Sequence, residues 1–450
     1  MEQKEAPEKT SFIKWFSEIN KDSGNLVGGK GANLGEMYNN NIPVPPGFVI
    51  TAQAYTYFIE KAGIKEKIEE LLGRINYEDT QQLDEITRQI RAFIIDSKLP
   101  ENLQEEIIES YELLDVKPEN IEKGAALDIL KNSAEPVFVA VRSSATTEDL
   151  AEASFAGQQD TYLNIKGKNQ LLEHIKKCFA SLFTSRATYY RNKKGFPHNK
   201  SYLAVVVQKM INSDKSGVMF SRDPTNKSDN IILEAVWGLG EGIVSGKITP
   251  DHYIILHELE VLDKKIADKK IALTRTASGE KSEARLSPEK SRYQVLKEHE
   301  IMKLSDYAQR LEKHYQQSQD IEFAISDNEL YIVQTRPITT IKKSEEKKEY
   351  EELEGEIIIR GLPASHGIAV GNVKLIENSS DLNKLKKGDI LVTKMTNPDM
   401  VVAMQRASAI ITDDGGLTAH AAIVSREMGI PCIVGTGEAT QKLQDDQTIT

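Results

Sequence analysis

Short apolar runs alternate with amphipathic stretches along most of the chain. The apolar runs have the length and β-branched character of buried strands, and the amphipathic stretches repeat apolar residues at helical spacing. The strand patterns lie at 137–144, 202–211 and 229–237, and the helical patterns at 54–72 and 170–183. This mixture predicts a large lobe of α+β or α/β structure.

A charged stretch at 342–354 contains almost no apolar residues and separates two regions that differ in composition and pattern. Such a run is typical of a solvated linker or an exposed helix. The region after it is compact and rich in glycine and short apolar runs. We therefore expect a large domain over 1–340, a linker over 341–355, and a small domain over 356–450.

The composition limits the class of protein. At roughly 150 residues per domain, 450 residues leave room for about three domains. The formal net charge of −11 disfavours binding to nucleic acid or to an anionic membrane surface. We find no apolar run of membrane-spanning length and no secretory signal at the N-terminus. The 2 cysteines fit neither a disulfide framework nor a metal set, so we expect a cytoplasmic protein.

The common phosphate-binding signatures, the P-loop and the Rossmann glycine pattern, do not occur. The segment 25–37 instead places Lys30 between glycines just before a predicted helix. Backbone N–H groups of a glycine turn and the positive end of a helix dipole both favour an anion. The alternative is that these glycines only make a tight turn.

A second candidate anion site follows the strand at 137–144. This strand delivers Arg142, whose guanidinium fork can contact two phosphate oxygens. Hydroxyl side chains suited to a triphosphate cluster beside it, at Ser143, Ser144, Thr146 and Thr147. The alternative is a surface turn in which Arg142 pairs with Glu148 or Asp149.

The segment 321–338 predicts a β-hairpin with its turn at 327–328. A three-residue loop would pair Glu322 with Gln334, whereas a two-residue loop would separate them. Paired, their oxygens suit Mg²⁺, which is usually shared with phosphates, and Arg336 follows on the same strand. An ordinary cross-strand hydrogen bond is the alternative.

The segment 412–437 is the most informative in the chain. A predicted strand ends before Thr418, an N-cap type of residue, and a helix pattern then runs to Gly429 and Pro431. His420 would lie in the first helical turn, where the dipole disfavours imidazolium and keeps a nitrogen available as a nucleophile. A phosphorylated His420 would face the helix N–H groups. The alternative is a polar surface or capping residue.

Several long motifs resemble one enzyme family. GGLTAHAAIVSREMGIPCIVGTG resembles the phosphohistidine signature of the phosphoenolpyruvate-utilising enzymes. Further segments resemble the ATP-grasp domain of the pyruvate,phosphate dikinase type. They are VGGKGANLGEM, PVPPGFVIT, AVRSSATTEDL, SFAGQQDTYLN, GVMFSRDP, EAVWGLGEGIVSGKITPD, and DIEFAI with LYIVQTRP. Their order is similar to that in the phosphoenolpyruvate synthases.

The resemblance implies a two-lobed ATP-grasp domain, with subdomains of about 1–200 and 201–340, followed by a small swivelling β/β/α phosphohistidine domain. It places Lys30 and Arg142 on the ATP phosphates, with Ser143 and Thr146 among the nucleotide-binding candidates. By the same resemblance, Glu322 and Gln334 would bind Mg²⁺, and Glu234 and Arg336 would occupy other active-site positions. The segment with Gly240 would be a flexible loop near the nucleotide. His420 would be the residue that is phosphorylated.

The implied reaction is attack of His420 on ATP with release of AMP, loss of phosphate by hydrolysis, and transfer of the remaining phosphoryl group to pyruvate. The product would be phosphoenolpyruvate, a step of gluconeogenesis. The family's pyruvate-binding (β/α)₈ barrel, of about 250 residues, would follow residue 450. We therefore expect a truncated or split enzyme, with a possible homodimer or a partner chain carrying the barrel. These 450 residues alone should phosphorylate His420 but form no phosphoenolpyruvate.

Two positions depart from the family pattern. Ala419 stands where synthases commonly have Cys and dikinases often Ser, and His366 stands where proline is usual. We interpret the second as structural variation. Pyruvate,phosphate dikinase, which transfers to phosphate instead of water, and a non-catalytic nucleotide sensor or phosphocarrier partner stay open as alternatives. Rifampicin phosphotransferase is disfavoured because only a short hinge separates Pro337 from Gly361.

Overall fold

The computed structural model describes residues 11–77, 79–114, 136–146, 160–225, 228–276, 278–338, 356–397 and 400–450. The chain forms two compact units. The first ends at Met210, and the second comprises 211–450 together with the short segment Ile42–Val44. The predicted linker 341–355 lies outside the described residues.

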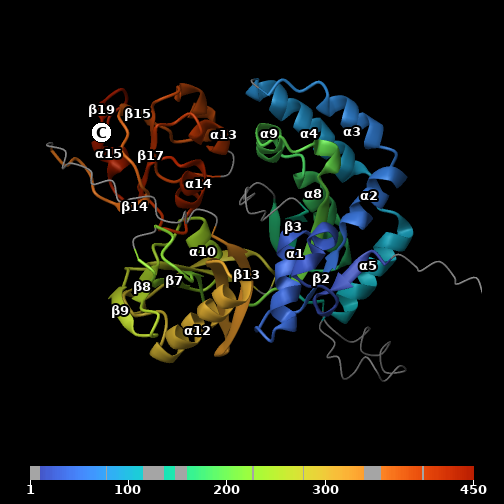
Figure 1. Ribbon diagram of the computed structural model, residues 1–450, viewed down its shortest axis with the longest axis horizontal. Helices are drawn as coiled ribbons and strands as arrows, with labels where there is room; N and C mark the ends of the chain where they lie inside the picture. The colour runs from blue at the N-terminus through green and yellow to red at the C-terminus, as the bar shows by residue number, and fades with distance from the viewer. Residues whose placement is uncertain are drawn as a thin grey trace, which may run out of the picture. The chain divides into compact units, whose positions relative to one another are not determined.

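The first unit is built on a sheet in which the described strands follow the order β1-β2-β5-β3-β4, with every pair antiparallel. The strands are β1 (Ile13–Trp15), β2 (Gly47–Ile50), β3 (Val139–Ala145), β4 (Thr161–Ile165) and β5 (Leu203–Lys209). Every residue of β3 is buried. Ser144 contacts α1 (Gly24–Asn39). Val141 lies three positions away and so on the other face, where it shares a core cluster with residues of α8 (Lys168–Ser181). Helices α1 and α8 therefore cover the two faces of this strand; Figure 1 labels all three elements.

The other α-helices among the described residues of this unit are α2 (Ala52–Lys61), α3 (Lys65–Leu72), α4 (Thr80–Asp96), α5 (Glu101–Leu113) and α9 (Ser185–Lys193). The helical pattern at 54–72 is confirmed, but it forms two separate helices, α2 and α3. Gly63 has φ +63° just past the end of α2, and this left-handed conformation ends the helix.

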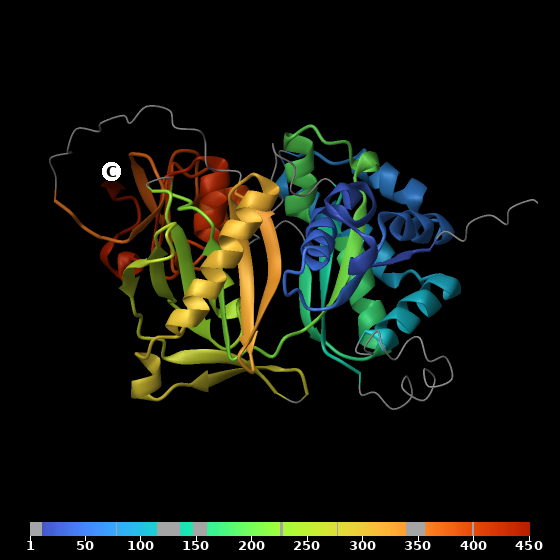
Figure 2. The same ribbon diagram turned by 60° about the horizontal axis from the view of Figure 1, so that its bottom comes forward.

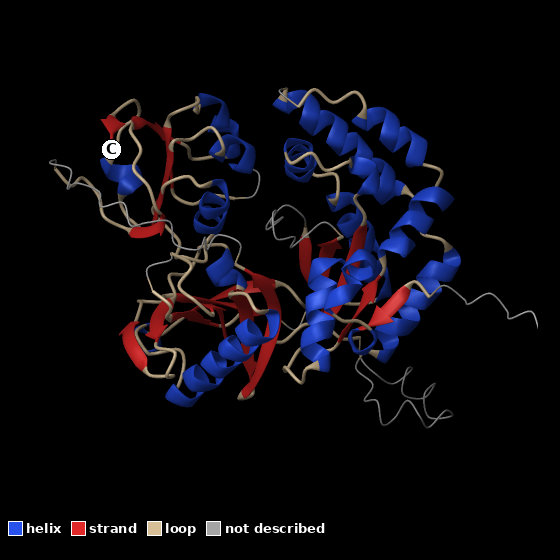
Figure 3. Ribbon diagram, viewed as in Figure 1, coloured by secondary structure: helices blue, strands red, loops and turns tan. Residues whose placement is uncertain are grey.

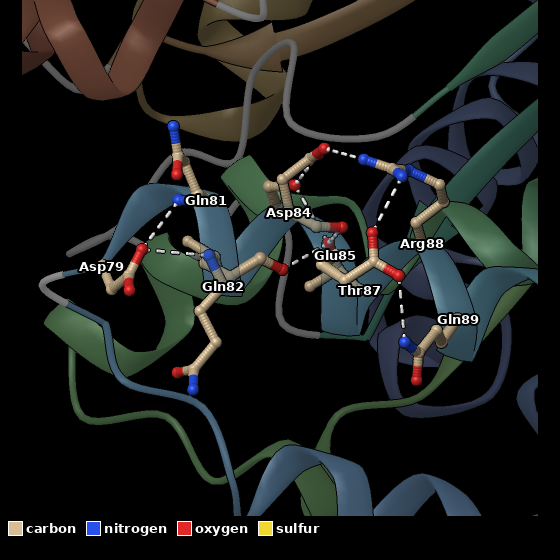
Figure 4. Close-up of polar contacts among 10 residues, drawn as sticks. Asp79, Gln81, Gln82, Asp84, Glu85, Thr87, Arg88 and Gln89 are labelled. Atoms are coloured by element: carbon tan, nitrogen blue, oxygen red, sulfur yellow. Dashed lines mark hydrogen bonds and ion pairs between the residues drawn. The ribbon is translucent and has the colours of Figure 1, made fainter.

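Helix α4 shows how the sequence fixes a boundary. The carboxylate of Asp79 accepts hydrogen bonds from the backbone N–H groups of Gln81 and Gln82, both at 3.0 Å, so it caps the first turn (Figure 4). Further along, Arg88 pairs with Asp84 at 2.6 Å, one helical turn before it.

The second unit contains a sheet whose described strands follow the order β13-β12-β6-β7-β8-β9, again antiparallel throughout. The strands are β6 (Lys215–Phe220), β7 (Ile231–Trp237), β8 (Asp251–Ile255), β9 (Val261–Lys265), β12 (Gln319–Ser326) and β13 (Glu329–Pro337). Helix α12 (Glu298–Tyr315) crosses one face (Figure 2), where Lys215 pairs with Glu300 at 2.7 Å. We call the described residues of 211–338 the second lobe. The second lobe also contains strands β10 (Ile271–Arg275) and β11 (Lys281–Arg285) and helices α10 (Glu241–Val244) and α11 (Pro288–Ser291).

The described residues of 356–450, the small domain, form a mixed sheet in the order β14-β18-β17-β16-β15-β19. The central pairs are parallel, and β14 and β19 are added antiparallel at the edges (Figure 3). The strands are β14 (Leu362–Ser365), β15 (Gly371–Leu375), β16 (Ile390–Thr393), β17 (Ala409–Thr412), β18 (Cys432–Val434) and β19 (Thr448–Ile449). The helices are α13 (Val401–Met404), α14 (His420–Met428) and α15 (Ala439–Lys442).

Candidate functional site

Lys30 lies within α1, so its predicted place on a loop before the helix was wrong. The helix begins at Gly24 and is interrupted at Gly28, whose φ of +70° is not helical. A Cβ on Gly28 would lie 2.3 Å from the carbonyl oxygen of Ser144, so glycine is required there. Past this break, Lys30 Nζ donates to the carbonyl oxygen of Ser143 over 3.1 Å.

The two candidate phosphate-binding segments are joined by Ser144. Its hydroxyl donates to the carbonyl of Val27 over 2.8 Å and accepts from the backbone N–H of Gly31 at 3.1 Å. The structure thus brings the glycine segment and the end of β3 together, although 113 residues separate Gly31 from Ser144.

The other predicted residues of β3 are held by neighbouring strands and loops. Arg142 is buried, and its Nη1 donates to Gln208 of β5 over 3.2 Å. Ser143 Oγ donates to the carbonyl of Asp160 at 2.8 Å. Thr146 follows the strand and donates its backbone N–H to the carbonyl of Tyr202 at 3.1 Å. Thr147 and the alternative partners of Arg142 lie outside the described residues.

The hairpin of β12 and β13 pairs Glu322 with Gln334, but through a two-residue loop, which we expected to separate them. The loop has two residues, Asp327 and Asn328, with φ of +52° and +63°, and Ser326 pairs with Glu329. A two-residue loop alone would pair Glu322 with Val333. A β-bulge shifts the register between Glu322 and Phe323, so Val333 becomes the extra residue and Glu322 lies opposite Gln334.

Directly paired residues form a row across five neighbouring strands, which we call the polar row: Gln334, Glu322, Val218, Glu234 and His252. Residues that pair directly across strands point to the same face of a sheet. Lys215, three positions from Val218, points to the other face and contacts Glu300 of α12. The polar row therefore lies on the face opposite α12.

Arg336 and Asp320 lie on the same face, two residues along their strands from Gln334 and Glu322. Arg336 Nε and Nη2 donate to one oxygen of Asp320 at 2.9 and 2.7 Å. Burial lowers the pKa of Arg336, but Asp320, followed by Glu427 and Glu322, outweighs it, so the pKa is raised and the guanidinium stays charged. Sequence reasoning missed Asp320, although its two-residue spacing from Glu322 was a usable signal.

His420 is the first residue of α14, as the sequence predicted for the first helical turn. Its Nδ1 lies 2.8 Å from the hydroxyl of Thr396, a residue that sequence reasoning missed. The helix ends at Gly429, which adopts the left-handed conformation. The N-cap is Ala419 and not Thr418, so the expected capping role of Thr418 was wrong.

Thr418 instead contacts the second lobe. Its hydroxyl donates to Oε2 of Glu234 over 2.6 Å, and Glu234 is 1% exposed. Oε1 of the same carboxylate lies 3.5 Å from Nδ1 of His252. Near the other end of α14, the guanidinium of Arg426 lies 5.9 Å from the ring centre of Phe220 on β6. Burial lowers the pKa of Arg426. The helix that begins at His420 is thus attached to the face that bears the polar row.

Gly240 is the N-cap of a short helix, α10 (Glu241–Val244), and not part of an extended loop. The nearby Gly238 has φ +82° and bridges to Leu273, where a Cβ would lie 2.1 Å from the Leu273 carbonyl oxygen. The glycine-rich segment is therefore folded against β10.

The predicted site residues divide between the two units. Lys30, Arg142, Ser143 and Thr146 belong to the first, and Glu234, Gly240, Glu322, Gln334, Arg336 and His420 to the second. In the described parts of the chain, we find no group of three or more His, Cys, Asp and Glu side chains that could hold a metal ion. Within the same residues, no helix has the length and apolar character needed to cross a membrane.

Two family descriptions match the chain. Residues 24–356 match the pyruvate phosphate dikinase AMP/ATP-binding domain, and residues 385–450 match the mobile domain of the PEP-utilising enzymes. The first match covers more than half of the chain, which therefore belongs to this family of nucleotide-binding domains.

Similar curated proteins carry a more particular name. A phosphoenolpyruvate synthase of Pyrococcus furiosus is 46% identical over 98% of this chain, and probable phosphoenolpyruvate synthases of Pyrococcus horikoshii and Archaeoglobus fulgidus are 46% and 49% identical over 98% and 97% of it. In each case the chain spans 57% of the relative's length.

Proposed function

We propose that this chain uses ATP to phosphorylate its own His420, with release of AMP, and that the whole protein passes the phosphoryl group to pyruvate to form phosphoenolpyruvate. The observation that carries the proposal is the attachment of the helix beginning at His420, through Thr418, to Glu234 on the polar row. The names of the relatives support the same reaction.

In the proposed first step, a nitrogen lone pair of His420 forms a bond to the β-phosphorus of ATP. The bond from that phosphorus to the bridging oxygen of AMP breaks, and AMP leaves with the bonding electrons. Nδ1 lies 2.8 Å from the Thr396 hydroxyl, so we assign Nε2 as the nucleophile and let the Thr396 hydroxyl accept a hydrogen bond from Nδ1–H. The helix N-terminus then stabilises the anionic product.

In the proposed second step, water attacks the terminal phosphorus of the pyrophosphoryl group. The bond from the terminal phosphorus to the bridging oxygen breaks, the terminal group leaves as inorganic phosphate, and the phosphoryl group that keeps the bridging oxygen stays on His420. Transfer to pyruvate would need the pyruvate-binding barrel of the family. We propose that the small domain swings between the nucleotide and pyruvate sites, with residues 341–355 as its hinge.

We assign the ATP phosphates to the two lobes of an ATP-grasp fold. Lys30 and Arg142 would bind phosphate oxygens, since both are cationic and lie on joined segments of the first unit. Ser143 and Thr146 would add hydroxyl groups from the end of β3. In the second unit Arg336 would neutralise charge that develops on the transferred group.

Glu322 and Gln334 would hold Mg²⁺. They fit this ion because they offer one carboxylate and one amide oxygen from paired positions on one face. A site with so few protein ligands suits Mg²⁺, which takes its other ligands from phosphates and water. When bound, the ion would neutralise phosphate charge.

Product analysis tests the proposal. The chain is incubated with ATP and Mg²⁺, and the nucleotide and phosphate products are separated. We expect AMP and inorganic phosphate in wild type and neither in His420→Ala, with His299→Ala on α12 as a control that retains both. ADP as the product would contradict the proposal. A requirement for phosphate with release of pyrophosphate would identify the dikinase reaction instead.

A further inference from the structure

The turn after β14 makes a direct contact with the loop after β6. Nε2 of His366 lies 3.0 Å from the backbone carbonyl oxygen of Thr225. A carbonyl oxygen can only accept a hydrogen bond, so Nε2 carries the proton, and both the neutral Nε2–H form and the imidazolium can donate. The bond joins the small domain to the second lobe.

The acceptor is held in place by its own loop. Asp223 Oδ1 accepts from the backbone N–H of Thr225 at 2.8 Å and from its hydroxyl at 2.6 Å, and Oδ2 accepts from Ser228 Oγ at 3.3 Å. Asp223 and Thr225 are both buried. These hydrogen bonds to Asp223 hold the backbone and side chain of Thr225 and so orient its carbonyl.

His366 is also firmly connected to α14. The adjacent Gly367 has φ +146°, and a Cβ there would lie 2.6 Å from Pro431, which follows α14. Arg426 of α14 donates from Nη1 to the carbonyl of Ala364 on β14 at 3.3 Å. A displacement of the His366 turn would therefore be transmitted to the helix that begins at His420.

Two other contacts of the small domain reach the same part of the second lobe. Arg426 lies over Phe220, the last residue of β6, and Thr418 donates to Glu234 on the neighbouring β7. The His366 contact lies just beyond the end of β6. The Thr418 contact lies just before the start of α14, the Arg426 contact lies near its end, and the His366 contact lies just after the neighbouring strand β14. Together the three contacts hold α14 against the second lobe.

We propose that His366 is a positioning residue for the phosphorylation of His420. Its hydrogen bond to Thr225 holds the small domain in the docked arrangement in which α14 faces the polar row. This inference rests on the proposed function, and it adds a residue that neither the sequence analysis nor the family signature assigned to the site.

The test compares His366→Phe, which removes the donor, with His366→Gln, whose amide N–H can replace it. The control is His299→Gln, an exposed histidine on α12. With β-³²P-labelled ATP in a single turnover, we expect His366→Phe to label His420 about three- to tenfold more slowly than wild type, as for one lost hydrogen bond. His366→Gln should restore most of the rate, and ATP affinity and the thermal midpoint should stay unchanged.

Hydrogen exchange of the same variants without ATP measures docking directly. We expect His366→Phe, but not His366→Gln or His299→Gln, to raise exchange in peptides from β6, β7 and α14. Unchanged exchange in His366→Phe would overturn the proposal, as would an equal slowing in the Gln and Phe variants. If wild type takes up no label, the proposed function fails, and exchange still decides the docking role.

Discussion

The hydroxyl of Thr418 donates a 2.6 Å hydrogen bond to the carboxylate of Glu234, a residue 184 positions earlier in the chain. Glu234 lies on the polar row, and Thr418 lies two residues before His420. One hydrogen bond therefore connects the proposed phosphoryl acceptor to the strand face on which the proposed metal ligands lie.

This contact can be tested by a double-mutant cycle of Glu234→Ala and Thr418→Val. Each change should slow the labelling of His420, because each removes the bond that seats α14. Since the bond involves a charged acceptor, we expect a coupling energy of about 1.5 kcal/mol or more in the single-turnover rate. Strictly additive effects would contradict a direct role for the bond.

Glu322 is expected to set the Mg²⁺ requirement. Glu322→Gln should raise the Mg²⁺ concentration needed for half-maximal AMP release by about tenfold or more, because it removes a charged oxygen ligand. Glu329→Gln, at the exposed start of β13, is the matched control and should leave the titration unchanged. Identical Mg²⁺ titrations of both variants would exclude the assigned metal site.

Gly28 is expected to tolerate no side chain. Gly28→Ala combines φ +70° with a Cβ 2.3 Å from Ser144 and should lower the free energy of unfolding by about 2 kcal/mol or more. It should also weaken ATP binding, since Lys30 follows the break. Gly24→Ala, where nothing lies within 4 Å, is the control. Equal stability of the two variants by urea unfolding would show that the break is not required.

His198 makes the stability of the first unit depend on pH. Burial, followed by the charge of Arg191, lowers the pKa of His198 from 6.5 to about 4. Arg191 Nε donates to its Nδ1 at 3.1 Å, an arrangement that only the neutral ring allows. Between these two pKa values the unfolded chain binds a proton that the folded chain does not. The free energy of unfolding should therefore decrease as pH falls from about 6.5 towards 4.

Urea unfolding followed between pH 7 and pH 4 checks this dependence. His198→Gln removes the titrating group and should flatten the decrease over that interval. A decrease of the same slope in His198→Gln would assign the pH dependence to other groups.

The hairpin shows how far the sequence could predict the site. The Asp327–Asn328 turn was evident, since both residues tolerate positive φ. The register was not evident, because the bulge at Val333 changes which residues face each other and has no clear signal in the apolar pattern. The pairing of Glu322 with Gln334 was foreseen as one alternative, but for the wrong loop length.

The small domain shows a second reason why the sequence could predict only part of the site. Gly429 and the helical pattern correctly placed His420 at a helix start, because these signals are local. Thr418 has a local N-cap preference, but its hydroxyl contacts Glu234 in another part of the unit. His366 likewise has a long-range partner, the carbonyl of Thr225, and so could only be interpreted as variation from sequence. Contacts of this kind are set by packing between segments and not by local propensity.

Mapping the position of the label tests the central claim most directly. The chain is incubated with Mg²⁺ and with ATP labelled at the β- or at the γ-phosphorus, and the acid-labile label is located by peptide mapping. We predict that β-label is retained on the peptide that contains His420, that γ-label is lost as inorganic phosphate, and that His420→Ala takes up neither. Stable γ-label without β-label, or label on any other residue, would contradict the account.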